Sequence, residues 1–138
     1  MKTGKNVIIA LALLANLWFV SSCNNGPKRE VWLDEVYKDS CFVQDWGIPQ
    51  INQSVVWTPL TVNGVVYKRG IGAHSISRML YDLGGKAVSV SGLVGADDNN
   101  LYAGKLQFKI IGDKKELWKS GVMRKGDPVK EFNVSLSG

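Results

Sequence analysis

Closely spaced glycines in the middle of the chain constrain its fold more than any other feature. Between residues 70 and 98 they divide the sequence into short apolar runs, at Gly70, Gly72, Gly84, Gly85, Gly92 and Gly95. Runs of this length are typical of β-strands joined by tight turns, because glycine adopts positive φ without steric cost. The same stretch contains the only histidine, His74, and ends in a polar cluster over residues 97–100. The centre of the chain is therefore predicted to form consecutive strands.

Alternating patterns predict strands elsewhere in the chain as well. Apolar and polar residues alternate over 105–110 and over 132–137, a period of two that is typical of half-buried strands. Further strands are predicted over 55–57, 78–83 and 87–94. No sustained helical period follows Cys23. Many short strands with glycine turns indicate an antiparallel β-sandwich or barrel.

Two other segments carry predictions of their own. Asn63 and Gly64 lie between β-branched residues, which predicts a β-hairpin over 60–67, because both turn positions accept positive φ. Residues 41–54 show no clean period and include Trp46. We expect a long ordered loop there, and loops of this length are often functional.

The N-terminus has the composition of a secretory signal. A basic start precedes an apolar run over 7–20, which is shorter than the ~20 residues needed to cross a bilayer. The run ends in Val-Ser-Ser-Cys, which resembles the lipobox of bacterial lipoproteins and predicts that residues 1–22 are removed and that Cys23 is acylated. The alternative is an ordinary signal peptide followed by a chance cysteine. An acylated Cys23 would anchor the protein outside the cytoplasm, at the outer membrane or the cell surface.

The rest of the chain is predicted to be a tether over 23–30 and one domain over 31–138. Its basic residues are scattered, and the formal net charge of the full chain is +5, which does not predict nucleic-acid binding. If Cys23 is acylated, Cys41 has no disulfide partner, and we expect it to be a small buried residue. The histidine and cysteines are not spaced as in zinc sites.

Several motifs, taken in order, carry a resemblance to a known family. They are the segments 59–67, 70–75, 81–85, 95–98, 108–113 and 120–122. Together they resemble the NPCBM family of carbohydrate-binding modules, and the similarity extends over nearly all of 31–138. One departure is Ala73, where the family usually has threonine. Segments 45–50 and 78–80 are most similar to modules that precede melibiase-like α-galactosidases.

The resemblance implies both a fold and a setting. It implies an all-β, galactose-binding-domain-like (discoidin-like) jelly-roll β-sandwich over 31–138. It also implies that the C-terminal strand or strands of the family fold are missing from this sequence. Modules of this family are usually attached to secreted glycoside hydrolases. The expected partners are therefore a galactose-containing glycan, a downstream catalytic domain and, through the lipid, a membrane.

The residues themselves do not favour catalysis by this chain. Glycoside hydrolysis needs two carboxyl groups about 5 to 9.5 Å apart across a cleft. The pairs Asp34-Glu35 and Asp97-Asp98 are sequence neighbours, and neighbours on a strand point to opposite faces. We therefore expect a non-catalytic binding module. The alternatives are a structural sandwich that packs on a catalytic domain without binding sugar, and a surface adhesion or protein-interaction module.

Sugar binding needs an aromatic face and a few well-placed polar groups. The predicted carbohydrate-binding residues are Trp46, His74, Arg78, Tyr37 and Asp98. For three of them a structural alternative stays open: Trp46 buried under its loop, His74 pinning a turn, and Arg78 paired with a carboxylate. The tryptophans in strand-like runs, Trp32, Trp57 and Trp118, are expected in the core.

Oxygen-rich side chains next to the strand over 87–94 suggest one metal. Asp97 and Asn99 could be ligands of a structural calcium ion, because Ca²⁺ prefers hard oxygen donors. The segment does not match an EF-hand loop, and the alternative is a solvated turn between strands. No cofactor is required by the expected function.

Overall fold

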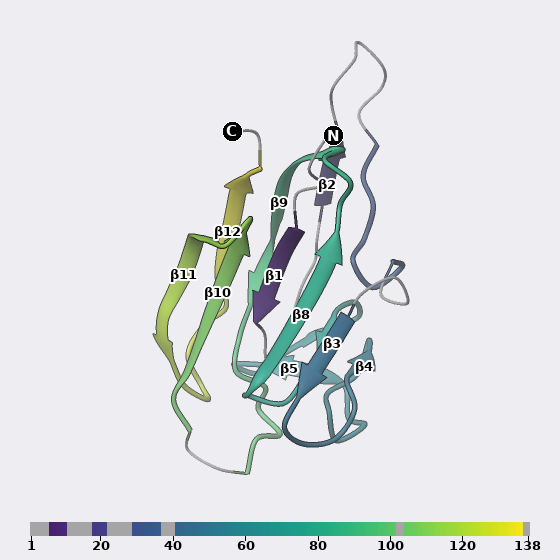
Figure 1. Cartoon of the computed structure of the whole chain (residues 1–138). Helices are drawn as coiled ribbons and strands as arrows, with labels where there is room; N and C mark the ends of the chain where they lie inside the picture. The colour runs from purple at the N-terminus through teal and green to yellow at the C-terminus, as the bar shows by residue number, and fades with distance from the viewer. Residues whose placement is uncertain (1–5, 11–17, 22–28, 37–40, 102–103, 137–138) are drawn as a thin grey trace.

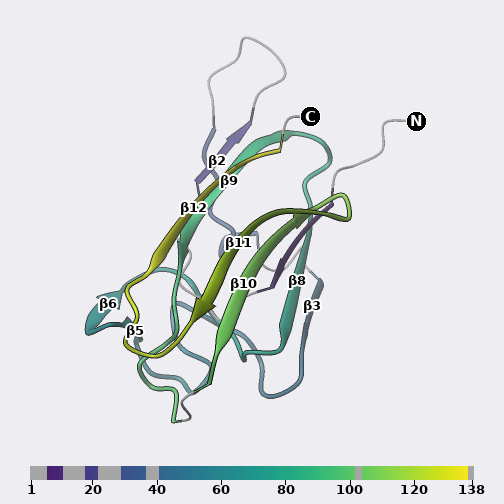
Figure 2. The same ribbon diagram turned by 90° about the vertical axis from the view of Figure 1, so that its left-hand side faces the viewer.

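The computed structural model describes residues 6–10, 18–21, 29–36, 41–101 and 104–136, and these form an all-β sandwich of two facing sheets (Figures 1 and 2). The larger sheet contains, in spatial order, β11 (Lys115–Met123), β10 (Leu106–Gly112), β1 (Asn6–Ala10), β8 (Ser77–Asp82) and β3 (Cys41–Gln44). The smaller sheet contains β12 (Lys130–Ser135), β9 (Ala87–Val94) and β2 (Trp18–Ser21). Two short pairs complete the fold: β4 (Gln50–Ile51) with β7 (Ile71–Gly72), and β5 (Leu60–Val62) with β6 (Val65–Tyr67). The expected fold class is confirmed.

The core lies between the two sheets and follows from the alternation in the strands. The larger sheet contributes alternate residues of β8 and β10, namely Met79, Tyr81, Phe108 and Ile110. The smaller sheet contributes Val90, Val94, Phe132 and Val134. Full burial of one such side chain stabilises a fold by roughly 1.5 to 3 kcal/mol. The sandwich therefore depends on both sheets being present and aligned.

The predicted hairpin over 60–67 is confirmed, including the positive φ angles of its turn. Asn63 and Gly64 have φ of 48° and 75°, so both turn positions adopt positive φ between β5 and β6. Leu60 and Val62 point inward and are buried, while Val66 is exposed. The hairpin projects from the side of the sandwich, as Figure 2 shows. The strands predicted over 78–83, 87–94, 105–110 and 132–137 are also confirmed, to within one or two residues at their ends.

Three expectations for the segment 41–57 are wrong. Residues 41–54 are not one long loop, because they include β3, which pairs with β8, and β4, which pairs with β7. These strands depend on partners that are distant in sequence, so the local sequence pattern does not reveal them. Residues 55–57 form a turn rather than a strand. Cys41 is exposed, because it lies on the edge strand of the larger sheet and faces outward.

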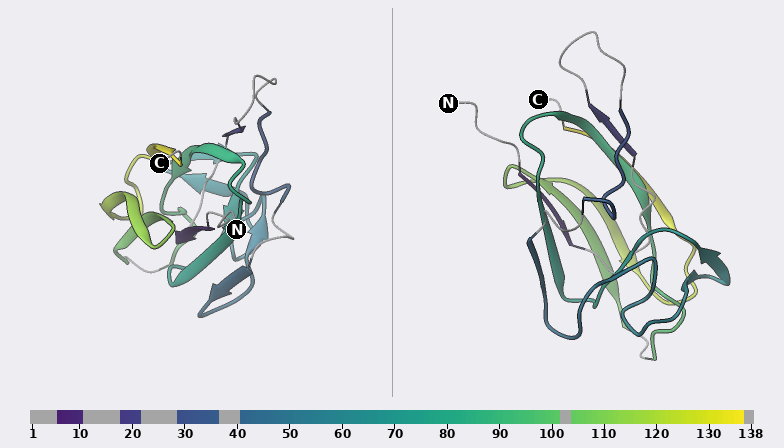
Figure 3. Two further views of the ribbon diagram at one scale, coloured as in Figure 1. Left: turned by 45° about the horizontal axis from the view of Figure 1, so that its top comes forward. Right: turned by 90° about the vertical axis from the view of Figure 1, so that its right-hand side faces the viewer.

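The N-terminal segment contributes two strands to the described structure. β1 lies between β8 and β10 in antiparallel register with both, and β2 pairs with β9 at the edge of the smaller sheet. The start of β1 and the end of β12 lie at the same end of the sandwich (Figure 3). None of the described residues forms a helix long and apolar enough to cross a bilayer. Cleavage before Cys23 stays a prediction, and Cys23 lies outside the described residues.

Candidate functional site

A cavity of about 650 Å³ opens at the end of the sandwich where β3 and β9 end. Three segments line most of it: the loop after β3 with the residues before β8, the turn after β4, and the segment after β9. The lining residues are Trp46, Ser54, Val55, Val56, Leu60, Gly72, Ala73, His74, Ser75, Asp97, Asn99, Asn100, Leu101, Gly104, Lys105 and Leu106. Cavities of about 300 to 1,000 Å³ with apolar walls and a few polar groups are typical of small-ligand sites.

Trp46 and His74 form one wall of the cavity, and together with Gln44 and Asp45 they make up a cluster that we call the aromatic corner. The rings of Trp46 and His74 lie 5.7 Å apart, centroid to centroid, at an interplanar angle of 58°. Trp46 is 56% exposed, so most of its indole is available for contact. A largely exposed indole beside an imidazole offers both an apolar surface and a hydrogen-bonding atom.

Hydrogen bonds hold the aromatic corner in place. The Gln44 side chain bridges its two halves, since its Nε2 donates to the Trp46 carbonyl at 2.8 Å and its Oε1 accepts the His74 N–H at 3.2 Å. The Asp45 carboxylate pairs with His74 Nδ1. A carboxylate only accepts hydrogen bonds, so Nδ1 carries the proton in this pair, and no hydrogen bond among the described residues involves Nε2.

The second wall is the turn over 54–58, which Ser54 organises. The buried Ser54 hydroxyl lies 2.7 Å from the Thr58 hydroxyl and accepts the Thr58 N–H at 3.3 Å, and the Ser54 carbonyl accepts the Trp57 N–H at 2.9 Å. The turn packs directly on β7, because a Cβ at Gly72 would lie only 2.1 Å from the Gln53 carbonyl oxygen. This close approach needs glycine and brings Val55 and Val56 to the cavity.

The same turn overturns one prediction. Trp57 was expected in the core, but it is 64% exposed and has φ of 67°. The Ser54 hydrogen bonds close the turn and force Trp57 into a conformation that bulky residues rarely adopt. Its side chain points out of the fold and is not part of the cavity lining. Trp118, by contrast, packs on Phe132 at 5.4 Å and joins the core as expected, and Trp32 is half-buried.

The third wall is the polar segment after β9, and its carboxylates serve the fold. Asp97 accepts the N–H groups of Thr61 at 3.1 Å and of Asn99 at 2.8 Å. Asp98 accepts the N–H groups of Asn63 at 3.1 Å and of Gly64 at 2.8 Å, and so holds the tip of the hairpin. Hydrogen bonds from backbone N–H groups thus occupy both carboxylates.

The structure places the predicted sugar-binding residues in different surroundings. Trp46 and His74 meet at the cavity, and Asp97 and Asn99, predicted as calcium ligands, also line it. Asp98 lies behind the hairpin turn, outside the cavity lining. Arg78 is exposed on β8, and it too is not among the lining residues. Tyr37 lies outside the described residues.

Calcium binding by Asp97 and Asn99 stays a prediction. Among the residues that the structure describes, no group of three or more His, Cys, Asp or Glu side chains gathers in a way that could hold a metal ion. The oxygens of Asp97 and Asp98 point at backbone N–H groups of the hairpin and of their own segment rather than at a shared point. No step of the proposed function passes through a metal.

Sequence reasoning did not single out Gln44 and Asp45 as site residues, nor the apolar residues Val55, Val56 and Leu101. A weak signal existed for Asp45, which directly precedes Trp46 in a segment with a family resemblance. Gln44 gave no signal, because its role depends on His74, which lies 30 residues away in sequence.

A second cluster of aromatic and charged residues lies away from the cavity. We call it the arginine clamp, formed by Trp32, Asp34, Glu35 and Arg69. Arg69 donates from Nη2 to both Asp34 oxygens at 3.0 and 2.9 Å, and to Glu35 Oε1 at 2.9 Å. Its guanidinium lies 4.3 Å from the centre of the Trp32 ring. These hydrogen bonds, first from Glu35 and then from Asp34, raise the pKa of Arg69 further above its usual value.

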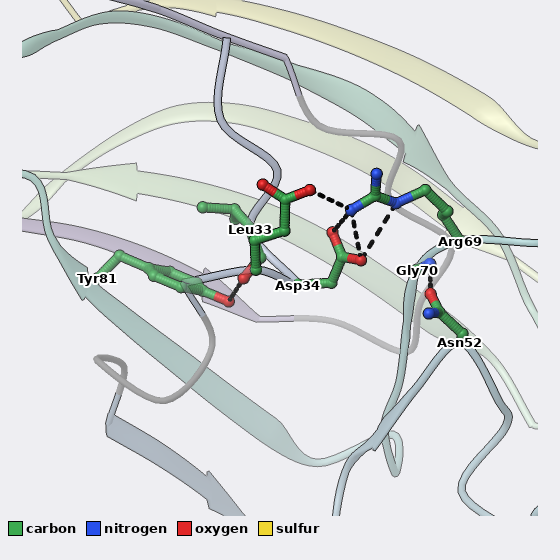
Figure 4. A network of polar contacts seen from close by, with 7 residues as sticks. Leu33, Asp34, Asn52, Arg69, Gly70 and Tyr81 are labelled. Atoms are coloured by element: carbon green, nitrogen blue, oxygen red, sulfur yellow. Dashed lines mark hydrogen bonds and ion pairs between the residues drawn. The ribbon is translucent and has the colours of Figure 1, made fainter.

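The arginine clamp ties the segment 29–36 to the sandwich, as Figure 4 shows. Beside it, Asn52 accepts the Gly70 N–H on its side-chain oxygen at 3.0 Å, and the Tyr81 hydroxyl donates to the Leu33 carbonyl at 3.3 Å. The Asp34 side chain is only 6% exposed. The network holds the segment 29–36 on the sandwich, and none of its residues lines the cavity described above.

Comparison with known proteins agrees with this fold. The family model of the NPCBM/NEW2 domain matches residues 29–138. A protein of Renibacterium salmoninarum that carries the name of an endo-α-N-acetylgalactosaminidase is 34% identical over 80 residues, which is 58% of this chain and 5% of that protein. The alpha-1,3-galactosidase B of Akkermansia muciniphila is 29% identical over 96 residues, or 68% of this chain and 12% of that enzyme.

This chain thus spans a small part of the length of the relatives that it matches. The family match covers the whole described sandwich except β1 and β2, which precede residue 29. It includes all four members of the aromatic corner and all four members of the arginine clamp. On this ground the chain belongs to the NPCBM/NEW2 domain family of carbohydrate-binding modules.

Proposed function

We propose that this chain is a non-catalytic carbohydrate-binding module that binds galactosides in the cavity beside the aromatic corner. The observation that carries the proposal is the exposed Trp46 indole next to His74, whose Nε2 is left for a ligand by the Asp45 pair. An indole packs on the C–H face of a pyranose, and an imidazole nitrogen can bond a ring hydroxyl. Ser75 and Asn99 add polar groups to the lining.

The choice of galactosides is supported by the relatives. One of them carries the name of an endo-α-N-acetylgalactosaminidase and the other that of an α-1,3-galactosidase, so both names refer to galacto-configured sugars. In a longer protein the module would bring a catalytic domain close to its glycan. The module itself would bind weakly, with a Kd on the order of 0.1 to 1 mM, because few direct contacts are available.

Calorimetric or NMR titration tests the proposal. Methyl α-galactoside should bind and methyl α-glucoside should bind several-fold more weakly. Trp46→Ala should weaken galactoside binding about 10-fold, or ~1.4 kcal/mol, and leave the melting temperature unchanged. The matched control is Trp57→Ala, which removes a similarly exposed tryptophan outside the cavity lining. Galactoside affinity that is unchanged in Trp46→Ala, or equally reduced in both variants, would place the site elsewhere.

A second role, packing on a catalytic domain, is favoured by a separate observation. Val43, Ile48 and Ile76 are 62%, 64% and 70% exposed near the edge of the larger sheet. Val43 lies on the edge strand, and the Ile76 carbonyl accepts the Asp45 N–H at 3.1 Å, so Val43 and Ile76 share one region, and Ile48 follows in the loop after β3. If the module binds no glycan in the titrations, this apolar region makes the structural role the better proposal.

The proposed setting includes a lipid anchor. We propose that residues 1–22 are removed and that Cys23 becomes the acylated N-terminus, on the grounds of the apolar run that ends in Val-Ser-Ser-Cys. Cys23→Ser should abolish lipidation and release the protein from the membrane fraction. Intact-mass measurement checks this, because the wild-type protein should begin at Cys23 and carry the mass of its acyl chains. A soluble wild-type protein that begins elsewhere would contradict the anchor.

A further inference from the structure

Trp57 stands out among the residues with a left-handed backbone. Five described residues other than glycine have positive φ, namely Asn52, Asn63, Asp113, Lys114 and Trp57. Asparagine and aspartate tolerate this conformation best, and the lysine lies in the tight turn between β10 and β11. A bulky aromatic residue at φ of 67° is an outlier, and such outliers occur most often at functional sites. Trp57 is therefore a candidate functional residue outside the cavity lining.

The fold itself gains little from the Trp57 indole. Trp57 is 64% exposed, and its side chain makes no hydrogen bond or ring contact with another described residue. The backbone closes the turn without it: the Ser54 N–H donates to the Thr58 carbonyl at 2.8 Å, and the Trp57 N–H donates to the Ser54 carbonyl at 2.9 Å. Glycine or asparagine at this position would accept the same φ at lower cost. The turn thus needs a residue that tolerates positive φ, and it does not need an indole.

The turn is held too closely to relax around its tryptophan. A Cβ at Gly72 would lie 2.1 Å from the Gln53 carbonyl oxygen and 2.6 Å from the Ser54 Cα, so the turn already touches β7. The buried Ser54 hydroxyl accepts the N–H groups of Val56 and Thr58, both at 3.3 Å. Contacts on both sides of the tryptophan therefore fix the direction of its backbone. A side chain on such a fixed support is well placed for a ligand, because less conformational freedom is lost on binding.

The turn that carries Trp57 is also a wall of the cavity. Val55 and Val56 directly precede the tryptophan and line the cavity, and Leu60 lines it three residues later. Val56 is 43% exposed, so exposed apolar residues follow one another from the cavity wall to the indole. We call Val56 and Trp57 the outer shelf. It continues the apolar surface of the cavity beyond its lining.

The outer shelf is close to the aromatic corner, because the two segments that carry them touch. A Cβ at Gly47 would lie 3.2 Å from Val55 Cγ2, so the loop after β3 packs on the turn. Trp46 directly precedes Gly47, and Trp57 follows Val55 by two residues. Since successive Cα atoms are about 3.8 Å apart, both tryptophans lie within a short distance of this contact. One oligosaccharide can therefore reach both indoles.

The size of the exposed surface favours a sugar over a protein as the occupant of the outer shelf. A stable protein interface buries about 800 Å² on each partner, whereas a single aromatic side chain offers about 150 to 250 Å². A surface of that size suits one pyranose ring, whose C–H face packs on an indole in the same way as proposed for Trp46.

We propose that the outer shelf is a second sugar subsite, on which the unit next to the terminal galactose of an oligosaccharide packs. This inference rests on the proposed function, in which the terminal galactose occupies the cavity beside Trp46 and His74. The preferred ligand is then a galactose-terminated chain of two or more sugars. Methyl α-galactoside ends inside the cavity and does not reach Trp57, so Trp57→Ala remains a valid control for that ligand.

Calorimetric titration of the full chain with ligands of increasing length tests the proposal. The probes are methyl α-galactoside and galactose-terminated di- and trisaccharides in α-1,3 and β-1,4 linkage. The wild-type protein should bind at least one longer probe about 3- to 10-fold more tightly than the methyl glycoside. Trp57→Asn, which tolerates positive φ, should remove this gain and leave the affinity for methyl α-galactoside unchanged. Trp57→Phe should retain part of the gain, because an aromatic face remains.

Two further readouts separate a subsite from a structural role. In NMR spectra of isotope-labelled protein, the Trp46 indole N–H resonance should shift with every probe, and that of Trp57 only with the longer ones. The two resonances are assigned by their loss in Trp46→Ala and Trp57→Asn. Thermal melts of Trp57→Asn should show a melting temperature equal to that of wild type or higher, because the turn keeps its hydrogen bonds and loses an unfavourable residue.

Several results would overturn the proposal. They are the absence of any gain with length in wild type, a gain that survives in Trp57→Asn, and a clear drop in melting temperature, which would make the indole part of the fold. A Trp57 resonance that no probe shifts would also overturn it and favour a protein contact. The proposed function fails separately, if methyl α-galactoside does not bind to wild type or binds equally well to Trp46→Ala.

Discussion

The arginine clamp and the aromatic corner are built from similar residues but lie in different surroundings. Each combines a tryptophan, a carboxylate and a basic side chain. In the clamp, Asp34 is 6% exposed and Arg69 is engaged by two carboxylates and the Trp32 ring. In the corner, His74 and Asp45 are 35% and 41% exposed and Trp46 is 56% exposed beside a cavity. The two clusters therefore differ in the burial of one carboxylate and in the cavity beside Trp46 rather than in residue types, and this difference supports the proposed division between scaffold and site.

The contrast follows from where each cluster lies along the chain. The clamp joins the segment 29–36 to the connection between β6 and β7, so its ion pairs hold these two segments together. The corner joins two loops at one end of the sandwich, so its bonds align the loops and leave the ring faces open. We expect substitutions in the clamp to change stability and substitutions in the corner to change binding.

The largest effect should come from Arg69→Met. Removing the guanidinium leaves the largely buried Asp34 carboxylate without its partner. The cost should be about 2 to 4 kcal/mol of unfolding free energy, below the value for a fully buried pair because Arg69 is partly exposed. Urea unfolding measures it. Arg69→Lys keeps the charge but loses the two-oxygen contact, so it should fall between wild type and Arg69→Met.

Galactoside affinity of the folded Arg69→Met protein should stay within error of wild type. This measurement tests whether the arginine clamp and the aromatic corner act independently. If Arg69→Met weakens binding as strongly as Trp46→Ala while the protein remains folded, the two clusters are coupled and the proposed division between scaffold and site is wrong.

A smaller effect, on binding alone, should come from Asp45→Asn. The amide can accept or donate, so it no longer fixes the proton on His74 Nδ1, and Nε2 loses its single defined role. Galactoside affinity should fall about 3- to 10-fold, or ~0.7 to 1.4 kcal/mol, while the melting temperature stays unchanged. Glu131→Gln, an exposed change of the same kind on β12, is the matched control. A large loss of stability in Asp45→Asn would make the corner a structural cluster like the clamp.

The sequence allowed the architecture to be predicted because its signals are local. Alternation over β10 and β12, and the Asn63–Gly64 turn, depend on residues next to one another. The prediction failed where structure depends on distant partners. β3 forms because β8 lies beside it, and Trp57 is exposed because Ser54 and Thr58 close a turn.

The candidate site was predicted in part for the same reason. Trp46 and His74 are residue types that stand out in a loop, so both could be named from the sequence. The role of Asp98 could not be seen, because it holds the hairpin through Gly64, 34 residues away in sequence. The charge of Asp98 suggests a sugar-binding role, but its carboxylate accepts hydrogen bonds from backbone N–H groups of the hairpin turn.

The smallest effect should come from a third charged cluster, which provides a baseline for the other two. On the outer face of β10 and β11, Glu116 pairs with Lys109 at 2.9 Å and with Lys119 at 3.4 Å. The hydrogen bond from Lys109, followed by that from Lys119, holds the pKa of Glu116 below its usual value. A carboxyl group whose pKa is lower in the folded state adds stability above its unfolded pKa and loses it as pH falls through the folded pKa.

Because the group is exposed, Glu116→Gln should change the melting temperature at pH 7 by an amount near the limit of measurement. The small difference from wild type should vanish at acidic pH, where the wild-type carboxyl is also neutral, and it should shrink in high salt, which screens exposed pairs. Thermal melts at several pH values check this. If Glu116→Gln lost as much stability at pH 7 as Arg69→Met, the exposure of a charged cluster would not determine its contribution to stability.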